Sequence, residues 1–391
     1  MRLLFVADGR SPIALNWMRY FVEAGDEVHL ASTFQCKPEL ALASLHLTPA
    51  ALSGLKVASG AGGKAPARGG VWGGAALRLR TAVRQWLGPL TLRRAGQRLR
   101  AVIAHLHPDL VHAMRIPFEG MLAAEAGPGA PLLVSVWGND FTLHATASPL
   151  MRRRTLQTLQ RADALHADCQ RDMRLAAAWG FPASRPQIVL PGAGGVQAEL
   201  FHPPTGEERS AVVPLVIQPR GFRAYVDNRA FFYAARLIAA RLPAVRFVCP
   251  AMAGHTQAVR WVKELGLEAH VELLPSQSRE QMASLFRRAQ AAVSPSTHDG
   301  TPNTLLEAMA CGCFPIAGDL DSLREWITSG VNGLLVDPRD PQQIADAVLL
   351  ALRSPELRQR AAEKNTALIA ARADYRAVMP RARQFYLDLL L

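Results

Sequence analysis

The sequence lacks the features of membrane-spanning, disulfide-linked and disordered proteins. No window holds eighteen uninterrupted apolar residues, and the first apolar stretch, residues 2–7, runs directly into Asp8, Gly9 and Arg10, so we expect neither a membrane span nor a signal peptide. The five cysteines are scattered and odd in number, which indicates reduced thiols in a cytoplasmic protein. Apolar residues make up 49% of the chain and charged residues 19%, a composition typical of a packed protein.

Two signatures of cofactor and metal binding are also missing. A dinucleotide fold normally carries G-x-G-x-x-G after its first strand, whereas residues 7–17 read ADGRSPIALNW with one glycine, which disfavours a nicotinamide or flavin enzyme. Cys311 and Cys313 form a C-x-C pair without the second Cys/His pair of a structural zinc site. We therefore expect no bound metal and no cofactor.

Positive charge is the excess that the sequence does have. Lysine and arginine number 44 and aspartate and glutamate 32, a formal net charge of +12. Such a surface field favours phosphate-rich partners. Composition alone leaves nucleic acid, anionic lipid and nucleotide phosphates open.

Short apolar runs alternate with helix-patterned segments in two series, the pattern of parallel sheets covered on both faces. The strands expected in the first series are residues 3–7, 28–31, 110–113, 132–137, 164–167 and 188–190. Those expected in the second are residues 213–218, 245–249, 271–274, 291–294, 314–317 and 333–336. Between the series, residues 203–211 read PPTGEERSA, which is typical of a linker.

The chain of 391 residues is long enough for two domains. We expect an α/β protein of two doubly wound, Rossmann-like domains that face each other across a cleft, since such sheets bind ligands beyond the carboxyl ends of their strands. The boundaries that follow are 1–204 for the first domain and 205–375 for the second. A final helix, 376–391, is expected to pack back toward the first domain.

The most informative stretch is residues 294–318, which read SPSTHDGTPNTLLEAMACGCFPIAG. A strand feeds a polar loop, and Thr301 followed by Pro302 is typical of an N-cap with proline at the first helical position. The helix is predicted to begin near Asn303. Its free N–H groups and its dipole would favour an anion, such as a diphosphate, at the mouth of the loop.

Glu307 lies four residues after Asn303, so both share a helix face that can look out of the core. A carboxylate would repel phosphate, so a pair of sugar hydroxyls, which donate hydrogen bonds, is the better partner for it. The alternative is that Glu307 only complements the helix dipole.

This stretch resembles the E-x7-E signature of family 4 of the retaining glycosyltransferases, which have the GT-B fold, with Asp299 in place of the first Glu and Glu307 as the second. The resemblance implies that Glu307 binds the ribose of the nucleotide and that Asp299 contacts the donor sugar near the reacting carbon. It also implies donor binding by the backbone of a short loop. That loop comprises Gly300, Thr301, Pro302, Asn303 and Thr304.

The resemblance extends over almost the whole chain, through segments such as HPDLVHA, VSVWGNDF and VLPGAGGVQAELFHPP. VIQPRGFRAYVDNRAFF resembles the family's donor-phosphate motif, with Arg220 as its arginine and Arg223 as the nearest cation to its lysine position, which holds Tyr225. Solvent-exposed arginines on a turn are the alternative. The family would place Gly9 near the donor diphosphate and Asp140 near the reacting centre, although an Asp in such a loop is as often a helix cap.

The resemblance implies a retaining hexosyltransferase that needs no metal and uses a nucleotide diphosphate sugar, with Asp299, Arg220 and Asp140 as catalytic residues. Asp319 and Asp321 have D-x-D spacing, but their place at a helix start favours capping. The acceptor would be a glycan, a glycolipid or another cell-envelope molecule. Alternatives are a nucleotide-sugar epimerase or a glycan phosphorylase on the same fold, and an inactive scaffold at a membrane surface.

Residues 78–100 contain seven arginines and no acid, interleaved with apolar residues and Trp86. The pattern favours amphipathic helices on an anionic membrane surface, which would make the protein peripheral on the inner face of the membrane. The arginines expected to bind there are Arg78, Arg80, Arg84, Arg93 and Arg94. A solvated helix face is the alternative, and nucleic acid is not expected, because no recognised reading motif accompanies these arginines.

Overall fold

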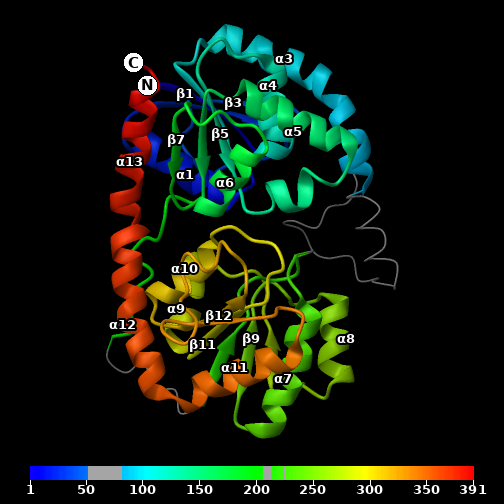
Figure 1. Cartoon of the computed structure of the whole chain (residues 1–391), viewed down its shortest axis with the longest axis vertical. Helices are drawn as coiled ribbons and strands as arrows, with labels where there is room; N and C mark the ends of the chain where they lie inside the picture. Colours follow the sequence, from blue (N-terminus) through cyan, green and yellow to red (C-terminus); the bar gives the residue numbers. More distant parts are fainter. Residues whose placement is uncertain (52–81, 206–212, 224) are drawn as a thin grey trace. The chain divides into compact units, whose positions relative to one another are not determined.

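The computed structural model describes residues 1–51, 82–205, 213–223 and 225–391, and it divides into two compact α/β units (Figure 1). The first unit comprises Met1–Gly194 together with Ala377–Leu391, and the second comprises Gly195–Arg376. Residues 195–204, which the sequence assigned to the first domain, therefore group with the second unit. Arg78, Arg80 and part of the predicted linker lie outside the described residues.

The first unit is built on a seven-stranded sheet with the order β3-β2-β1-β4-β5-β6-β7. All its pairings are parallel; Phe5, for example, lies opposite Leu30 on one side and His112 on the other. The strands are β1 (Arg2–Ala7), β2 (Glu27–Ser32), β3 (Ser44–Leu47), β4 (Leu110–Ala113), β5 (Leu132–Val136), β6 (Ala164–Ala167) and β7 (Gln187–Val189).

β3 is the strand of this sheet that the sequence analysis missed. Its residues read SLHL and alternate between half-buried and exposed, because β3 lies at the edge of the sheet. The search for strands relied on continuous apolar runs, which mark strands that are buried on both faces. An edge strand of four residues carries no such run.

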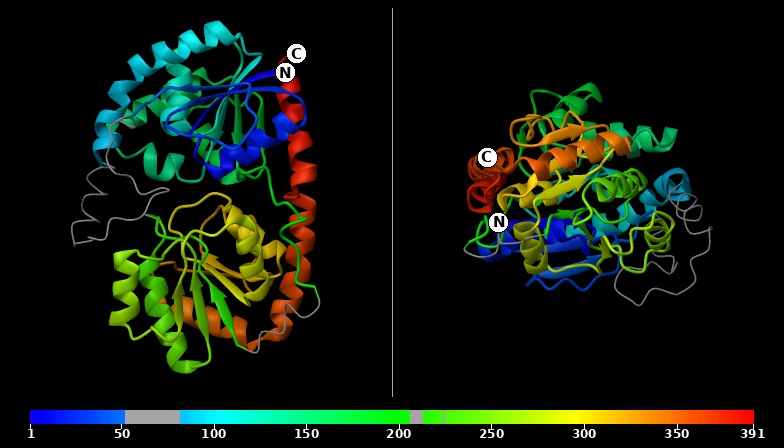
Figure 2. Two further views of the ribbon diagram at one scale, coloured as in Figure 1. Left: turned by 180° about the vertical axis from the view of Figure 1, so that it is seen from behind. Right: turned by 90° about the horizontal axis from the view of Figure 1, so that it is seen from below.

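Helices cover both faces of this sheet (Figures 1 and 2). One face packs against α3, α4 and α5 through a core that includes Leu99, Leu122 and Leu159. The opposite face receives α1 and α13, where Phe21 stacks on Tyr386 with ring centroids 4.6 Å apart. The helices are α1 (Pro12–Glu23), η1 (Gly88–Thr91), α3 (Leu92–Leu106), η2 (Ile116–Gly120), α4 (Met121–Ala126), η3 (Asp140–His144), α5 (Pro149–Arg161), α6 (Gln170–Ala178) and α13 (Tyr375–Asp388).

The second unit has a six-stranded sheet with the order β10-β9-β8-β11-β12-β13, again parallel throughout. Each of its strands was predicted. They are β8 (Leu215–Ile217), β9 (Arg246–Cys249), β10 (Val271–Leu273), β11 (Ala291–Ser294), β12 (Phe314–Gly318) and β13 (Leu334–Val336). The expectation of two doubly wound, Rossmann-like units is confirmed.

Helices cover both faces of this second sheet (Figures 1 and 2), with one apolar cluster on each face. Phe247 and Phe314 belong to the cluster with α7, α8 and α11, and Phe286 and Met309 to the cluster with α9, α10 and α12. The helices are α7 (Asn228–Arg241), α8 (Thr256–Glu264), α9 (Arg279–Arg288), α10 (Asn303–Ala310), α11 (Pro341–Arg353) and α12 (Pro355–Arg372).

Candidate functional site

In each sheet the chain reverses its direction of travel across the strands at one place. This switch point lies between β1 and β4 in the first unit and between β8 and β11 in the second. The loops after two such strands part to opposite faces of the sheet and leave room for a ligand at the carboxyl ends. Most of the predicted site residues of the second unit lie in the loops after β8 and β11 or on the helix that follows β11.

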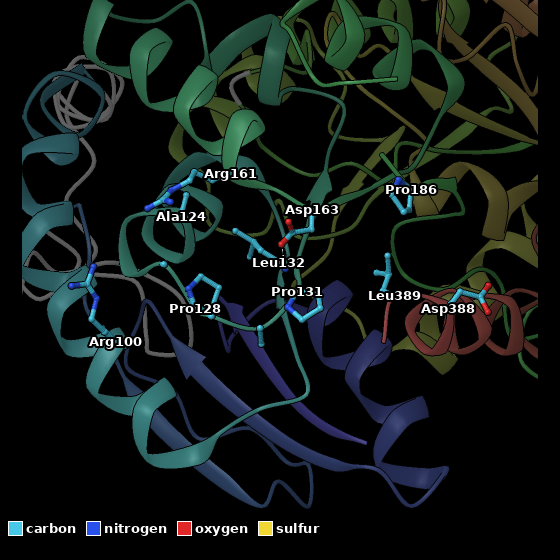
Figure 3. A pocket seen from close by; sticks show the side chains of 13 residues that line it. Arg100, Ala124, Pro128, Pro131, Leu132, Arg161, Asp163, Pro186, Asp388 and Leu389 are labelled. Atoms are coloured by element: carbon cyan, nitrogen blue, oxygen red, sulfur yellow. Dashed lines mark hydrogen bonds between the residues drawn. The ribbon is translucent and has the colours of Figure 1, made fainter. Parts of the chain in front are cut away.

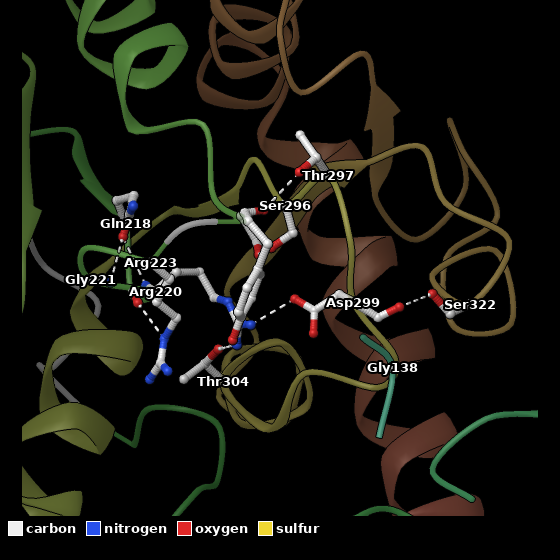
Figure 4. A network of polar contacts seen from close by, with 12 residues as sticks. Gly138, Gln218, Arg220, Gly221, Arg223, Ser296, Thr297, Asp299, Thr304 and Ser322 are labelled. Carbon is white, nitrogen blue, oxygen red and sulfur yellow. Dashed lines mark hydrogen bonds and ion pairs between the residues drawn. The ribbon is translucent and has the colours of Figure 1, made fainter. Parts of the chain in front are cut away.

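Arg220 and Asp299 meet at the switch point of the second unit, although 79 positions separate them in the sequence (Figure 4). Arg220 Nη2 donates to Asp299 Oδ2 at 2.6 Å, and Nη1 donates to Thr304 Oγ1 at 3.2 Å. The two charged side chains are only 9% and 13% exposed, so water screens their attraction weakly. The structure thus brings together three residues that the sequence predicted separately.

The backbone around Arg220 is held by Gln218, at the end of β8 (Figure 4). Gln218 Oε1 accepts hydrogen bonds from the amides of Arg220 at 2.8 Å and Gly221 at 3.2 Å. Its Nε2 donates to Asn228 Oδ1 at 2.6 Å, which fixes the amide orientation. Because Gln218 and Asn228 are both buried, this loop is set before any ligand arrives.

The helix after β11 begins at Asn303, as predicted, but its N-cap is Pro302 and not Thr301. The Thr301 hydroxyl instead accepts a hydrogen bond from Trp326 Nε1 at 3.0 Å, a partner that sequence spacing does not reveal. Since proline has no side-chain acceptor, no side chain caps α10. Its first amides are therefore not taken by a capping side chain.

Glu307 lies one turn into α10 and is half-buried. Burial raises the pKa of its carboxyl to about 7, against the opposing effect of the Arg279 and Arg220 charges. Arg279, at the start of α9, is a neighbour that the sequence analysis missed, and its own guanidinium donates to Gln197 Oε1 at 2.9 Å. No motif marks it, because α9 and α10 meet only in the folded unit.

Arg223 is exposed, and its Nε donates to the carbonyl oxygen of Arg220 at 3.0 Å. Its charge therefore lies beside the Arg220 turn and outside the Asp299 ion pair. The Arg220 guanidinium also lies 5.9 Å from the ring centroid of Tyr225, the residue at the family's lysine position.

Asp140 is completely buried in the first unit, at the start of η3. Its Oδ1 accepts from Arg115 Nη2 at 2.7 Å, and Oδ2 accepts from the amides of Ile116 and Trp137 at 3.0 and 3.2 Å. Both oxygens thus hold parts of the protein, so the geometry makes Asp140 a positioning residue for Arg115.

Gly9 packs against β2 and the loop that follows it. Its amide donates to Ser32 Oγ at 3.0 Å, and a Cβ atom at this position would overlap Cys36 Sγ. Close packing explains this glycine without reference to a ligand.

A cavity of about 350 Å³ lies at the switch point of the first unit. Its walls come from the loops after β1, β4 and β5 and from a helical segment, residues 82–87. Its polar lining includes Arg10, Arg84, Arg115, Glu119, Trp137 and His144. The sequence analysis predicted none of these six for a small-molecule site.

A larger hollow of about 810 Å³ lies at the amino-terminal ends of the strands of this sheet, before β5, β6 and β7 begin (Figure 3). Its polar groups already tie loops together: Arg100 Nε donates to the Ala126 carbonyl at 2.8 Å, and Asp163 Oδ2 accepts from the Leu132 amide at 2.8 Å. Ligands of doubly wound sheets bind at the carboxyl ends of the strands, so we assign this hollow no role.

Among the described residues, one group has metal-ligand geometry, namely Asp168, Cys169 and Asp172. Arg171 forms an ion pair with Asp172 at 2.6 Å, and burial raises the pKa values of the Cys169 thiol and the Asp172 carboxyl. The Asp172 carboxylate, one of the three groups, is thus already engaged by an arginine. The D-x-D pair is occupied as well, since Arg324 bridges Asp319 and Asp321.

Comparison with protein families assigns the chain. Residues 9–192 match the model described as "Glycosyl transferase 4-like domain", and residues 234–367 match "Glycosyl transferases group 1". Each match lies within one of the two α/β units, in the order expected for the GT-B fold. The chain belongs to the family 4 glycosyltransferases.

Curated relatives of this family 4 chain include D-inositol 3-phosphate glycosyltransferases. The protein from Mycolicibacterium smegmatis is 30% identical over 262 residues, which cover 61% of this chain and 59% of the relative. The protein from Mycobacterium tuberculosis is 29% identical over 215 residues, which cover 50% and 42%. The chain thus spans about half the length of the curated relatives it matches.

Solved structures share the fold. Sucrose-phosphate synthase from Thermosynechococcus elongatus has a TM-score of 0.76 at 17% identity and covers 100% of this chain and 99% of its own. Anabaena HepE in complex with UDP has a TM-score of 0.70 at 16% identity, with 98% and 99% covered. These likenesses confirm the GT-B fold of this family 4 chain.

The basic stretch divides into residues with different surroundings. Arg93 and Arg94 are exposed on α3. Arg84, in contrast, turns inward, with its guanidinium 4.6 Å from the Phe118 ring centroid and 5.1 Å from that of Phe34. Arg84 therefore lines the cavity of the first unit, where the sequence analysis had placed it on a membrane surface.

Proposed function

We propose that this chain is a retaining, metal-independent glycosyltransferase of the hexosyl type. It would transfer a sugar from a nucleotide diphosphate sugar to a glycan, a glycolipid or another cell-envelope acceptor. The observation that carries the proposal is the contact of Arg220 with Asp299 and Thr304 at the switch point of the second unit. A cation, a carboxylate and a helix start meet there at 2.6 and 3.2 Å.

The arrangement suits a departing diphosphate. When the bond between the sugar C1 and the β-phosphate oxygen breaks, negative charge collects on that oxygen, and preorganised cations and amides stabilise it. Arg220, with Arg223 beside it, supplies cations, and the first amides of α10 supply N–H donors. These groups are present in the folded unit, and we propose that they stabilise the charge in place of a metal ion.

Asp299 would accept hydrogen bonds from the donor sugar, and Glu307 would accept them from the ribose of the nucleotide. Both carboxylates are natural partners for hydroxyl donors, and Asp299 is held at its free end by Arg220 and at its backbone carbonyl by Ser322 Oγ at 2.8 Å. In the proposed retaining step, the acceptor oxygen bonds to C1 on the face that the diphosphate leaves. The acceptor proton passes to the departing phosphate oxygen.

The names of the similar proteins support the donor class. The two relatives named above are D-inositol 3-phosphate glycosyltransferases, and HepE has been solved in complex with UDP-glucose. We propose a nucleotide diphosphate sugar as the donor and no further cofactor for this chain.

A peripheral place on the inner face of a membrane is also proposed, on the surface formed by Val83, Trp86, Leu87 and Leu90. The side chains of these four residues are between 37% and 65% exposed, on consecutive helical turns that lead into the exposed Arg93 and Arg94 of α3. Apolar residues beside arginines suit anionic lipid. Among the described residues, no helix is long and apolar enough to cross a bilayer.

The proposal is tested by calorimetry and thermal melting with UDP-, GDP-, ADP- and TDP-sugars, first without metal and then with magnesium. We expect one nucleotide to bind selectively without metal, and NMR of the product to show the anomeric configuration of the donor. Conversion of the donor into an epimeric nucleotide sugar, without an acceptor and without net nucleotide release, would favour an epimerase. Dependence on inorganic phosphate would favour a phosphorylase, and binding without turnover would favour a scaffold.

A further inference from the structure

The cavity of the first unit concentrates positive charge. Arg10, Arg84 and Arg115 reach it from three separate segments, and two carboxyls, Asp8 and Glu119, also line it. Its volume of about 350 Å³ suits a ligand the size of one substituted sugar ring. A net cationic pocket of this size selects for an anionic small molecule.

Each guanidinium is held in place by its surroundings. Arg10 pairs with Asp8 at 2.8 Å and lies 3.8 Å from the Phe34 ring centroid. Arg84 lies over the rings of Phe34 and Phe118. An aromatic ring that lies against a guanidinium attracts its charge and restricts its orientation. These cations are therefore arranged before a ligand binds.

Arg115 is held by a residue outside the cavity lining. Asp140, which does not line the cavity, accepts from Arg115 Nη2 at 2.7 Å, and the guanidinium lies 5.4 Å from the Trp137 ring. Asp140 thereby orients a cation toward the cavity from a fully buried position.

Glu119 is a buried carboxyl in the wall of this cavity. Its side chain is 3% exposed and accepts a hydrogen bond from Thr33 Oγ1 at 2.9 Å. Burial raises the pKa of this carboxyl, and the charges of Arg115 and Arg84 oppose that rise. The neighbouring Phe118 has a φ of 71°, a conformation that non-glycine residues hold only where surrounding structure enforces it.

Two further polar atoms in the lining are unused. The indole Nε1 of Trp137 and Nδ1 of His144 are buried and have no hydrogen-bond partner among the described residues. Burial and the charges of Arg115 and Arg84 lower the pKa of His144 to about 3, so its imidazole is neutral at physiological pH. Unsatisfied buried polar atoms are costly, and a ligand with hydroxyl and anionic oxygens would satisfy both.

We propose that this cavity is a binding site for a sugar or cyclitol that bears a phosphate or carboxylate group, with Arg10, Arg84 and Arg115 on the anionic group and Trp137 and His144 on the rest. The designation of this ligand as the acceptor rests on the proposed function. Its anionic chemistry rests on the cavity alone. A soluble sugar phosphate and a phosphorylated lipid headgroup share this chemistry.

The test compares glucose, glucuronate and glucose 6-phosphate by calorimetry with the full chain at one ionic strength. We expect at least one of the two anionic sugars to bind about tenfold or more tightly than glucose, as charge-assisted hydrogen bonds predict. Arg84→Gln should remove that preference, and Arg10→Gln should reduce it. Arg98→Gln, which changes an exposed arginine on α3, should leave it intact.

The proposal requires that the unchanged protein prefers the anionic sugars and that a folded variant has lost or reduced this preference. Circular dichroism checks each variant, and Arg10→Gln keeps the test decisive if Arg84→Gln does not fold. Equal binding of all three sugars, no binding of any, or unchanged selectivity in both variants overturns the proposal. Displacement of the anionic sugar by a nucleoside diphosphate also overturns it, because the cavity would then serve the donor.

Vesicles distinguish the two sources of the ligand. Competition by phosphatidylinositol vesicles, but not by phosphatidylcholine vesicles, would assign a lipid headgroup, and no competition would assign a soluble ligand. The donor screen reports separately on the proposed function. Donor binding without anionic-sugar binding sinks this inference alone, and the reverse result sinks the proposed function alone.

Discussion

Arg220 donates to both Asp299 and Thr304, and in the proposed function its guanidinium also stabilises the departing diphosphate. We expect Arg220→Gln to lower kcat/KM by about a hundredfold or more, the usual cost of losing a preorganised donor at a developing charge. Arg223→Gln is the matched control and should cost less, because that side chain is exposed. Steady-state kinetics with the identified donor measure both, and equal effects would contradict this division of roles.

Glu307 predicts a pH dependence of donor affinity. Burial raises the pKa of its carboxyl to about 7, so it is mostly protonated at pH 6 and mostly ionised at pH 8. The ionised form accepts hydrogen bonds from two hydroxyls, and the protonated form has lost part of this capacity. We expect donor affinity to rise between pH 6 and pH 8, measured by calorimetry.

The control for this titration is Glu307→Gln, which keeps the shape and has no ionisable group. Its donor affinity should be weaker and should not change over the same pH range. A slope that persists in this variant would assign the titration to another group.

Gly9 predicts a change in stability. In Gly9→Ala the new methyl group would overlap Cys36 Sγ and press on Ser32, so we expect unfolding to become easier by about 1–3 kcal/mol, the usual cost of overpacking. Gly192→Ala is the control, because its added Cβ would lie 3.7 Å from Asp168 Cβ, an ordinary van der Waals contact. Urea denaturation compares the two, and equal losses would contradict the packing argument.

At the scale of elements, α13 is tied to the first unit through a buried polar chain. Tyr386 OH accepts from Trp17 Nε1 at 2.9 Å and contacts His112 Nδ1, and His112 Nε2 pairs with Ser135 Oγ at 2.7 Å. Ser135 Oγ in turn pairs with His166 Nδ1 at 2.8 Å. The helices α13 and α1 and the strands β4, β5 and β6 are therefore joined by buried polar groups.

Tyr386→Phe should destabilise the first unit by about 1–3 kcal/mol, since it leaves buried Trp17 and His112 groups without a partner. Tyr233→Phe changes an exposed tyrosine on α7 and should cost little. The free energy of unfolding in urea, followed by tryptophan fluorescence, separates the two. Loss of stability in Tyr233→Phe but not in Tyr386→Phe would refute the role of this chain.

At the scale of the whole molecule, the surface of Val83, Trp86, Leu87 and Leu90 predicts membrane binding. Trp86→Ser with Leu90→Ser should reduce co-sedimentation with anionic vesicles several-fold, because two exposed apolar side chains are lost. Arg93→Gln with Arg94→Gln should weaken binding mainly at low salt. Val259→Ser, at an exposed apolar residue of α8, is the control, and unchanged binding in both double variants would rule out this surface.

The fold could be predicted to a large extent because most of its strands are rich in apolar residues and alternate with helix-patterned segments. Of the thirteen strands in the described residues, the sequence analysis predicted twelve, including the partly exposed edge strands β7, β10 and β13. β3 was not predicted, since its side chains alternate at the sheet edge. The linker was placed at residues 203–211, whereas the second unit begins at Gly195, because Val196 pairs with Asp374 in a bridge that only the tertiary fold forms.

The candidate site divides in the same way. The loop of Asp299 and the helix start at Asn303 could be predicted, because loop composition and proline position act locally. The interaction partners of these residues could not be predicted. Thr301 accepts a hydrogen bond from Trp326, and the Arg279 charge acts on Glu307, although both partners are too distant in sequence for any spacing rule. Arg84 was assigned to a membrane on its neighbours in sequence and lies against Phe34 and Phe118.

The sequence by itself thus determined the class of the fold, the family and the helix start after β11, because apolar periodicity and short motifs are local properties of the chain. The tertiary structure decided which charges meet. It paired Arg220 with Asp299 and gathered Arg10, Arg84 and Arg115 around one cavity. Only the meeting of strand ends at a switch point brings such distant side chains within a few ångströms, where their charges and hydrogen bonds act together.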